Sequence, residues 1–397
     1  MAVNNLTIEQ AYTLINALQA EVTGQNATTV AVDNATFNTV AQTTLKCGYD
    51  SVLNGIMQMV RKTIVSVRPY AAKFSGIEMT ADRWGAIVRK INFIDQPALE
   101  DPTFNRTGDV TGYNADTDQF NAPEAEVVET HYYGDNVYMQ GYKIYREQLV
   151  QAFTGPEAFA EFMSGLITHY SNQFEQWFED VKRSTLNNFI LAKADAGKVV
   201  YLLDEYKDAT GLTTLTPTSV LQPANYGPFM KWSYARINQI AEMFTERTEL
   251  FQSQITNKHI KRHTPKADQR LFMSAKYLGS LNAEVLADTY NDSFLKYATT
   301  EAVNFWQNPN EPEEINGTFT TIDATGAAVA KTAANLTGVI GVLFDRDAVG
   351  VNIGQNDLEA TQYNAKTQYS VVWHHARVRL ETDQTEKGVV FMLTAGN

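Results

Sequence analysis

Residues 156–193 read PEAFAEFMSGLITHYSNQFEQWFEDVKRSTLNNFILAK, with no proline after the first position. Apolar side chains recur in this run every three or four positions, the spacing of one buried helix face. Thr154 or Gly155 can cap the start, and Pro156 takes the first helical position. At 1.5 Å per residue the helix would be about 57 Å long, so the sequence predicts a strut that spans much of the molecule. The stripe consists of Phe159, Phe162, Met163, Leu166, Ile167, Tyr170, Phe174, Trp177, Phe178, Val181, Leu186, Phe189 and Ile190.

Two runs rich in β-forming residues, 84–94 and 125–145, precede the strut. The interval between them is dense in Asp, Asn, Gly, Pro and Thr, and it is far longer than the two to five residues of a hairpin loop. We therefore expect residues 95–123 to form a projecting flap or a functional loop. A solvated loop and an acidic arm that reaches a neighbouring subunit are both compatible with its charge. Its acidic residues are Asp95, Glu100, Asp101, Asp109, Asp116 and Asp118, against the single Arg106.

The N-terminal part predicts two amphipathic helices, at 7–22 and at about 37–61, joined by a small and polar stretch that looks like a flexible arm. Thr7 is the expected cap of the first helix. A terminal arm of this kind often packs on a neighbouring molecule.

The segment 199–344 mixes short helices and strands and reads as a separate α/β domain. We expect a helix at 229–244, buried strands at 270–273 and 338–344, and a loop-rich stretch at 309–335. Two further β runs follow, 367–380 and 388–393, on either side of a polar stretch at 383–387. The pattern predicts a terminal hairpin in which 383–387 is the turn.

Composition excludes several classes of protein. The chain has 397 residues, of which 44% are hydrophobic, enough for two or three packed domains. The net charge of −13 disfavours a dedicated nucleic-acid binder. Cys47 is the only cysteine, so an intrachain disulfide and a thiolate zinc cage are excluded. The apolar runs are too short for a membrane helix, and no secretory signal precedes them.

No catalytic motif is found: the chain lacks a Walker loop, a spaced glycine fingerprint, a nucleophile elbow and a His-Glu-x-x-His pattern. We predict no catalytic residue, no cofactor and no metal. His259 and His263 share a helical spacing, but surrounding cations oppose a metal ion. His374 and His375 alternate on a strand and cannot ligate one ion. The basic segment, defined as 258–270, is expected to be a solvated loop or to contact acidic neighbours or phosphates, with Lys258, Lys261 and Arg262 as candidates.

The order of these parts resembles the major capsid protein of a tailed bacteriophage, with an α+β fold of the Hong Kong 97 type. The run from Val128 to Phe178, VETHYYGDNVYMQGYKIYREQLVQAFTGPEAFAEFMSGLITHYSNQFEQWF, is similar in cadence to the flap-to-spine transition in capsid proteins of short-tailed phages of the phi-twenty-nine type. A second similarity is VLFDRDAVGVN, Val342 to Asn352, followed by a strand rich in Tyr, Val and Arg.

The resemblance implies a spine helix, an extended β-hairpin loop, a peripheral domain and an axial domain. Its implied boundaries are 1–62 for the N-terminal arm and helices, 84–134 for the extended loop, and 199–345 for the axial domain. The peripheral domain would combine 63–83, 135–198 and 346–397, with the spine helix at 156–193. Some relatives carry an isopeptide cross-link, but no lysine lies at the tip of this flap, so no cross-link residue is assigned.

The function implied by the resemblance is a shell protein that assembles as hexamers and pentamers into an icosahedral virion head around double-stranded DNA. A separate scaffolding protein and a portal are the implied partners, DNA would be near the shell without specific binding, and assembly would take place in the host cytoplasm. The alternatives are an encapsulin-like nanocompartment shell, a cytosolic enzyme with an active site that lacks a motif, and a phage neck or tail component.

Overall fold

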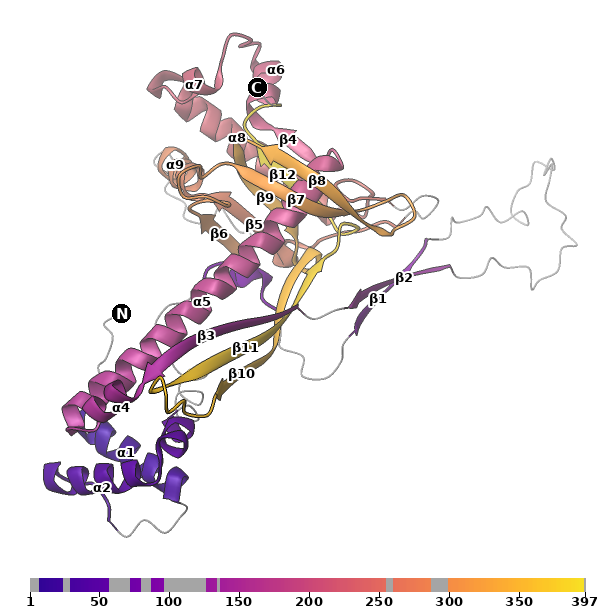
Figure 1. The fold of residues 1–397 in the computed structure, drawn as a ribbon. Coiled ribbons are helices and arrows are strands. Elements are labelled where there is room, and N and C mark those ends of the chain that lie inside the picture. The colour runs from indigo at the N-terminus through magenta and orange to yellow at the C-terminus, as the bar shows by residue number, and fades with distance from the viewer. Residues whose placement is uncertain are drawn as a thin grey trace, which may run out of the picture. The chain divides into compact units, whose positions relative to one another are not determined.

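The computed structural model describes residues 7–23, 29–56, 72–79, 87–95, 126–133, 136–254, 260–286 and 299–395. The chain divides into two compact units (Figure 1). Unit 1 consists of Met1–Gly85, Gly134–Lys182 and Val351–Leu380, and unit 2 of Ala86–Tyr133, Arg183–Gly350 and Glu381–Asn397. The domain boundaries expected from the sequence stay a prediction.

The predicted strut is a single helix, α5, Pro156–Asp195, of 40 residues. It is preceded by strand β3, Asn136–Tyr145, and by the short helix α4, Arg146–Ala152. A strand, a short helix and the long helix thus follow one another directly along the chain. Residues up to Lys182 belong to unit 1, and those from Arg183 onward belong to unit 2.

Unit 1 contains a three-stranded sheet in the order β10-β11-β3, where β10 is Val349–Ala360 and β11 is Tyr369–Thr382. Strands β11 and β3 are antiparallel, and Trp373 lies opposite Gly141. A Cβ atom at Gly141 would lie 2.7 Å from the Trp373 ring, so the close approach requires glycine there. The first part of α5 runs alongside this sheet (Figure 1).

Aromatic rings join α5 to the sheet of unit 1. Tyr170 packs on Tyr142 of β3 with ring centroids 4.3 Å apart, and Trp177 packs on Tyr138 at 5.0 Å. Phe174 lies on the same face between these contacts and is 7% exposed. The apolar stripe predicted from the sequence is therefore buried along this part of α5.

The N-terminal helices complete the core of unit 1. Helix α1 is Ile8–Thr23, and Thr7 caps it, because Thr7 Oγ1 accepts the Gln10 amide at 3.3 Å. Helix α2, Asn34–Lys46, is shorter than the predicted helix at 37–61. Gly48 has φ of +100°, which ends one helix before another begins at residue 49. Buried residues of α1 and α2 join one apolar core with residues of α4 and α5.

The core of unit 2 is a five-stranded sheet in the order β4-β12-β9-β5-β6. Strand β9 lies in the middle, antiparallel to both β12 and β5, and all of its residues are buried. The predicted strands at 270–273 and 338–344 are confirmed as β5 and β9. The bounds are β4 Val199–Tyr201, β5 Gln269–Ser274, β6 Thr299–Val303, β9 Val339–Asp345 and β12 Gly388–Met392.

Helices cover this sheet, and α8, Pro223–Thr245, confirms the helix predicted at 229–244. Phe229, Ile237 and Phe244 of α8 are buried in one cluster with residues of β5, β9 and β12. The other helices of unit 2 are α6 Leu202–Thr210, α7 Pro217–Val220 and α9 Ala275–Leu286.

Two predictions for the C-terminal half are wrong. The stretch at 309–335 is not mainly loop, because it contains the antiparallel strands β7, Ile315–Ile322, and β8, Ala328–Leu336. The terminal hairpin does not form either. Strand β11 pairs with β3, whereas β12 pairs with β4 and β9, so residues 383–387 connect two different sheets.

The core of unit 1 predicts a dependence of its stability on pH. Burial lowers the pKa of His374 to about 4 from 6.5, with a further contribution from the charge of His375. Between these values the unfolded chain binds a proton that the folded chain does not, so the free energy of unfolding falls as pH falls. The imidazole is partly exposed, so we expect a loss of about 2 kcal/mol from pH 7 to pH 4.

Urea unfolding of the unassembled chain at pH 7 and pH 4 measures this loss. The variant His374→Leu keeps an apolar side chain against Phe174, whose ring centroid is 5.2 Å from that of His374. We expect the stability of this variant to fall less on acidification. If both proteins lose the same free energy of unfolding on acidification, a group other than His374 causes the pH dependence.

Candidate assembly surfaces

The flap leaves unit 2 through a two-stranded stem formed by β1, Ile87–Phe93, and β2, Val127–Tyr133. The strands are antiparallel, Lys90 lies opposite Thr130, and the Ile94 amide donates to the Glu126 carbonyl at 2.9 Å. Of the acidic candidates in the flap, the structure describes Asp95, which forms an ion pair with Arg247. The other flap candidates lie outside the described residues: Glu100, Asp101, Arg106, Asp109, Asp116 and Asp118.

Lys90 joins the stem to the segment 383–387, here called the buried turn. Its Nζ donates to Asp383 Oδ2 at 2.7 Å and to Glu386 Oε1 at 2.5 Å. The carboxyl side chains of Asp383 and Glu386 are 4% and 8% exposed. The local sequence predicts a polar hairpin turn at 383–387 and assigns no contact to Lys90, because Lys90 and Asp383 are 293 positions apart.

Two more lysines hold the buried turn. Lys193, near the end of α5, donates to the carbonyls of Gln384 at 2.9 Å and Glu386 at 2.8 Å. Lys387 donates to the carbonyls of Phe244 at 3.2 Å and Glu246 at 2.5 Å, where α8 ends. The last carbonyls of a helix lack partners within the helix, so Lys387 acts as a C-terminal cap of α8. Burial lowers the pKa of Lys193 to about 7 and that of Lys387 to about 8.

Burial and ion pairing compete at the carboxylates of the buried turn. Burial favours the neutral form of Asp383, but Lys90 and the Thr385 hydrogen bonds outweigh it and hold the pKa of Asp383 below its usual range. At Glu386 burial prevails and raises the pKa. Acidification therefore protonates Glu386 before Asp383, and the contribution of Asp383 to stability is lost only below its ordinary pKa of 3.8. The contact between Lys90 and Asp383 thus persists in mild acid.

The basic segment lies beside the stem. A groove of about 520 Å³ is lined by Ile91 and Phe93 of β1 and by Lys261, Arg262 and His263. Carboxylates line the same groove, among them Glu386, whose Oε1 is 3.2 Å from Arg262 Nη1. Of the basic candidates, Arg262 is therefore paired within the chain, Lys261 is exposed, and Lys258 lies outside the described residues. The groove carries charges of both signs, so it is not a free cationic patch.

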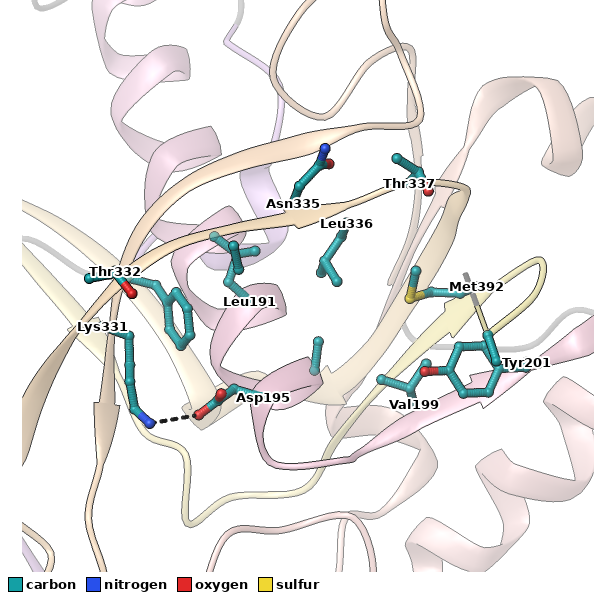
Figure 2. Close-up of a pocket in the computed structure, with 14 residues that line it drawn as sticks. Leu191, Asp195, Val199, Tyr201, Lys331, Thr332, Asn335, Leu336, Thr337 and Met392 are labelled. Atoms are coloured by element: carbon teal, nitrogen blue, oxygen red, sulfur yellow. Dashed lines mark ion pairs between the residues drawn. The ribbon is translucent and has the colours of Figure 1, made fainter. Parts of the chain in front are cut away.

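A second groove, of about 620 Å³, lies between the end of α5, β4, β8 and β12 (Figure 2). Lys331 and Asp195 face one another across it, with Nζ 3.6 Å from Oδ2, and both are partly exposed. Its remaining lining residues are apolar or carry amide and hydroxyl groups, and none of them is His, Cys or Ser. The lining of this groove thus lacks the serine, cysteine and histidine of the common pairs of nucleophile and base.

The described parts of the chain contain no group of three or more His, Cys, Asp or Glu side chains that could hold a metal ion. None of the described helices is long and apolar enough to cross a membrane. Exposed apolar side chains lie on the flap stem beside its groove and on edge strand β3, where Val137 is 60% and Met139 is 69% exposed.

The sequence profile of the Phi29-like phage major capsid protein family matches residues 15–392, nearly the whole chain. The chain belongs to the Phi29-like phage major capsid protein family. It is thus a structural protein of a bacteriophage capsid and a component of the virion, and it assembles into a shell of many copies.

Solved structures show that this capsid protein has the Hong Kong 97-type fold. A chain in the capsid structure of Staphylococcus phage Andhra aligns with a TM-score of 0.54 at 9% identity, over 84% of this chain and 86% of that chain. A chain in the structure of the head fiber and inner core protein gp22 of bacteriophage P68 aligns with a TM-score of 0.52 at 9% identity, over 82% of this chain and 85% of that chain. No protein in the curated set matches the sequence significantly.

Proposed function

We propose that this major capsid protein assembles as hexamers and pentamers into an icosahedral shell that encloses double-stranded DNA. The family match over residues 15–392 carries the proposal, since a shell protein of this family has to contact several copies of itself. The described stem supports it, because β1 and β2 lead into a flap too long to be a simple hairpin loop. Many weak contacts then suffice to hold a closed shell together.

The acidic balance of the chain fits a container for DNA. With a net charge of −13 the subunit does not attract phosphates at long range, so DNA is held by enclosure without specific binding. A cationic lining would hold the genome through salt-dependent contacts and hinder its packaging and release. A separate scaffolding protein and a portal complete the proposed set of partners, with assembly in the host cytoplasm and no enzymatic activity of the chain.

The intersubunit contact residues remain a proposal, centred on the flap. Asp95 and Arg262 already have partners within the chain, so we assign them a role in holding the base of the flap. Exposed Lys261 is the described candidate for a contact with an acidic neighbour. The tip candidates are Glu100, Asp101, Arg106, Asp109, Asp116 and Asp118, and Lys258 accompanies Lys261 in the basic segment.

Electron microscopy of the purified, concentrated protein tests the proposed assembly. We expect spherical shells, tubes or flat hexagonal arrays, since hexamers tile a plane and pentamers close it. Mass photometry at low concentration should show hexamers or pentamers alongside free subunits. A sample that contains discrete dimers or tetramers at every concentration would contradict the proposed function.

A further inference from the structure

The stem of the flap lacks the usual support of a larger sheet. Among the described strands, β1 and β2 pair with each other, whereas the other strands of the unit 2 core form a five-stranded sheet. An isolated two-stranded ladder is marginally stable in water. Another contact must therefore hold the stem in a fixed direction.

The described side chains of β1 point alternately toward solvent and toward the rest of unit 2, and those that are covered are polar. Ile91 and Phe93 are 46% and 68% exposed, whereas Asn92 is 6% exposed and the Lys90 side chain is 23% exposed. Consecutive residues of a strand point to opposite faces, so Lys90 and Asn92 share the covered face. Among the described side chains of β1, an ammonium and an amide thus meet the rest of unit 2, and Tyr132 of β2 is partly buried beside Asp383.

The buried turn is a preformed receptor for this ammonium. Asp383 Oδ1 accepts the Thr385 amide at 2.8 Å and the Thr385 hydroxyl at 2.6 Å, which leaves Oδ2 for Lys90. Lys193 fixes the backbone of the turn through the carbonyls of Gln384 and Glu386. A receptor with fixed oxygens makes the contact directional, because hydrogen bonds weaken steeply as they bend.

We propose that Lys90 is the positioning residue of the flap: its ammonium, clamped between Asp383 and Glu386, fixes the direction of the stem relative to the five-stranded sheet of unit 2. The other ion pairs of the stem are less suited to hold it in a fixed direction. Arg89 pairs with Glu129 within the stem itself, and the pair of Asp95 with Arg247 is more exposed and more strongly screened. The importance of the clamp for assembly rests on the proposed function of the flap in contacts between subunits.

Hydrogen exchange of the full chain, kept as unassembled subunits, tests the clamp without any shell. The variant Lys90→Met keeps the length of the side chain and removes its charge, and Arg89→Met is the matched control one residue away. For Lys90→Met we expect amide exchange in 87–95 and 126–133 to accelerate at least about tenfold, with β9 and β12 unchanged. For Arg89→Met we expect less than about twofold. Unchanged exchange, or equal acceleration in β9 and β12, would overturn the proposal.

Two further variants separate positioning from general destabilisation. Lys90→Arg keeps the charge and should restore most of the protection of the stem. Asp383→Asn leaves Lys90 in place but removes the partner that stays ionised, so we expect it to accelerate exchange in the stem as Lys90→Met does. If Lys90→Met does not fold, this variant tests the clamp in its place. A stem that stays protected in Asp383→Asn would contradict the clamp.

Particle formation supplies the second readout. Lys90→Met should lower the yield of shells at least about tenfold, whereas Arg89→Met should leave it near that of the unchanged chain. Normal yield from Lys90→Met would overturn the positioning role. If the unchanged chain forms no particles, alone or with its scaffolding protein, the proposed function fails, while the exchange comparison still decides whether Lys90 holds the stem.

Discussion

Deleting residues 97–121 is expected to abolish the formation of particles and to leave a folded subunit. The described end of the stem makes this deletion structurally mild, because the Ile94 amide already bonds the Glu126 carbonyl at 2.9 Å. Asp95, Gln96 and residues 122–125 would then join the strands as a short loop. Particle yield by sedimentation and electron microscopy should fall to background, while circular dichroism and the thermal midpoint stay unchanged.

A charge variant of the flap distinguishes shape from electrostatics. The acidic tip residues can be replaced by their amides without shortening the chain. If the tip contacts its neighbour through charge, this variant should assemble poorly at low salt and show little further dependence on salt. If the tip acts by shape, the amide variant should assemble normally while the deletion does not. Normal particles from the deletion would remove the flap from the proposed contacts. The residues to be replaced are Glu100, Asp101, Asp109, Asp116 and Asp118.

The long helix could be predicted because its signal is local and repeated. The stripe from Phe159 to Ile190 keeps helical spacing over many turns, and α5 follows it from Pro156 to Asp195. Strands β5 and β9 were predictable for a similar reason, since each is a compact apolar run. Local patterns of this kind need no knowledge of what the element packs against.

The buried turn could not be predicted because its environment comes from distant parts of the chain. Residues 383–387 are polar, which locally indicates an exposed turn, yet Lys387 is fully buried. Its partners are carbonyls at the end of α8, more than a hundred positions away in sequence. The same holds for Lys90, which looks like any exposed lysine on a strand until Asp383 and Glu386 are placed beside it.

Weak local signals explain the other errors. Strand β8, Ala328–Leu336, contains four alanines and one asparagine, residue types that are depleted in strands. The predicted helix at 37–61 continued through Gly48, because a single glycine is tolerated in a helical pattern. In the structure, the positive φ of Gly48 ends helix α2. The tip of the flap and Lys258, which the sequence also singled out, lie outside the described residues.

The double substitution Phe174→Ala with Trp177→Ala is expected to destabilise unit 1 by about 5 kcal/mol. Phe174 is 7% exposed, and its ring packs at a tilt against that of Trp177, with ring centroids 5.7 Å apart. Single changes of this kind cost about 3 to 5 kcal/mol in a core, but Trp177 is only half-buried and the two rings touch, so the costs do not add fully. A hollow of about 290 Å³ already lies beside both rings and would grow.

Urea unfolding of the unassembled subunit measures this loss, with Gln176→Ala as the matched control, because Gln176 lies between the two residues on the exposed side of α5. An unfolding midpoint for the double variant equal to that of Gln176→Ala would show that the stripe does not hold unit 1 together. Both this variant and the flap deletion should reduce particle yield, so yield alone cannot tell them apart. The stability of the free subunit distinguishes the two variants, because the core variant lowers this stability and the flap deletion does not. A protein that loses assembly with its stability intact has lost a contact between copies, and that outcome is expected for the flap alone.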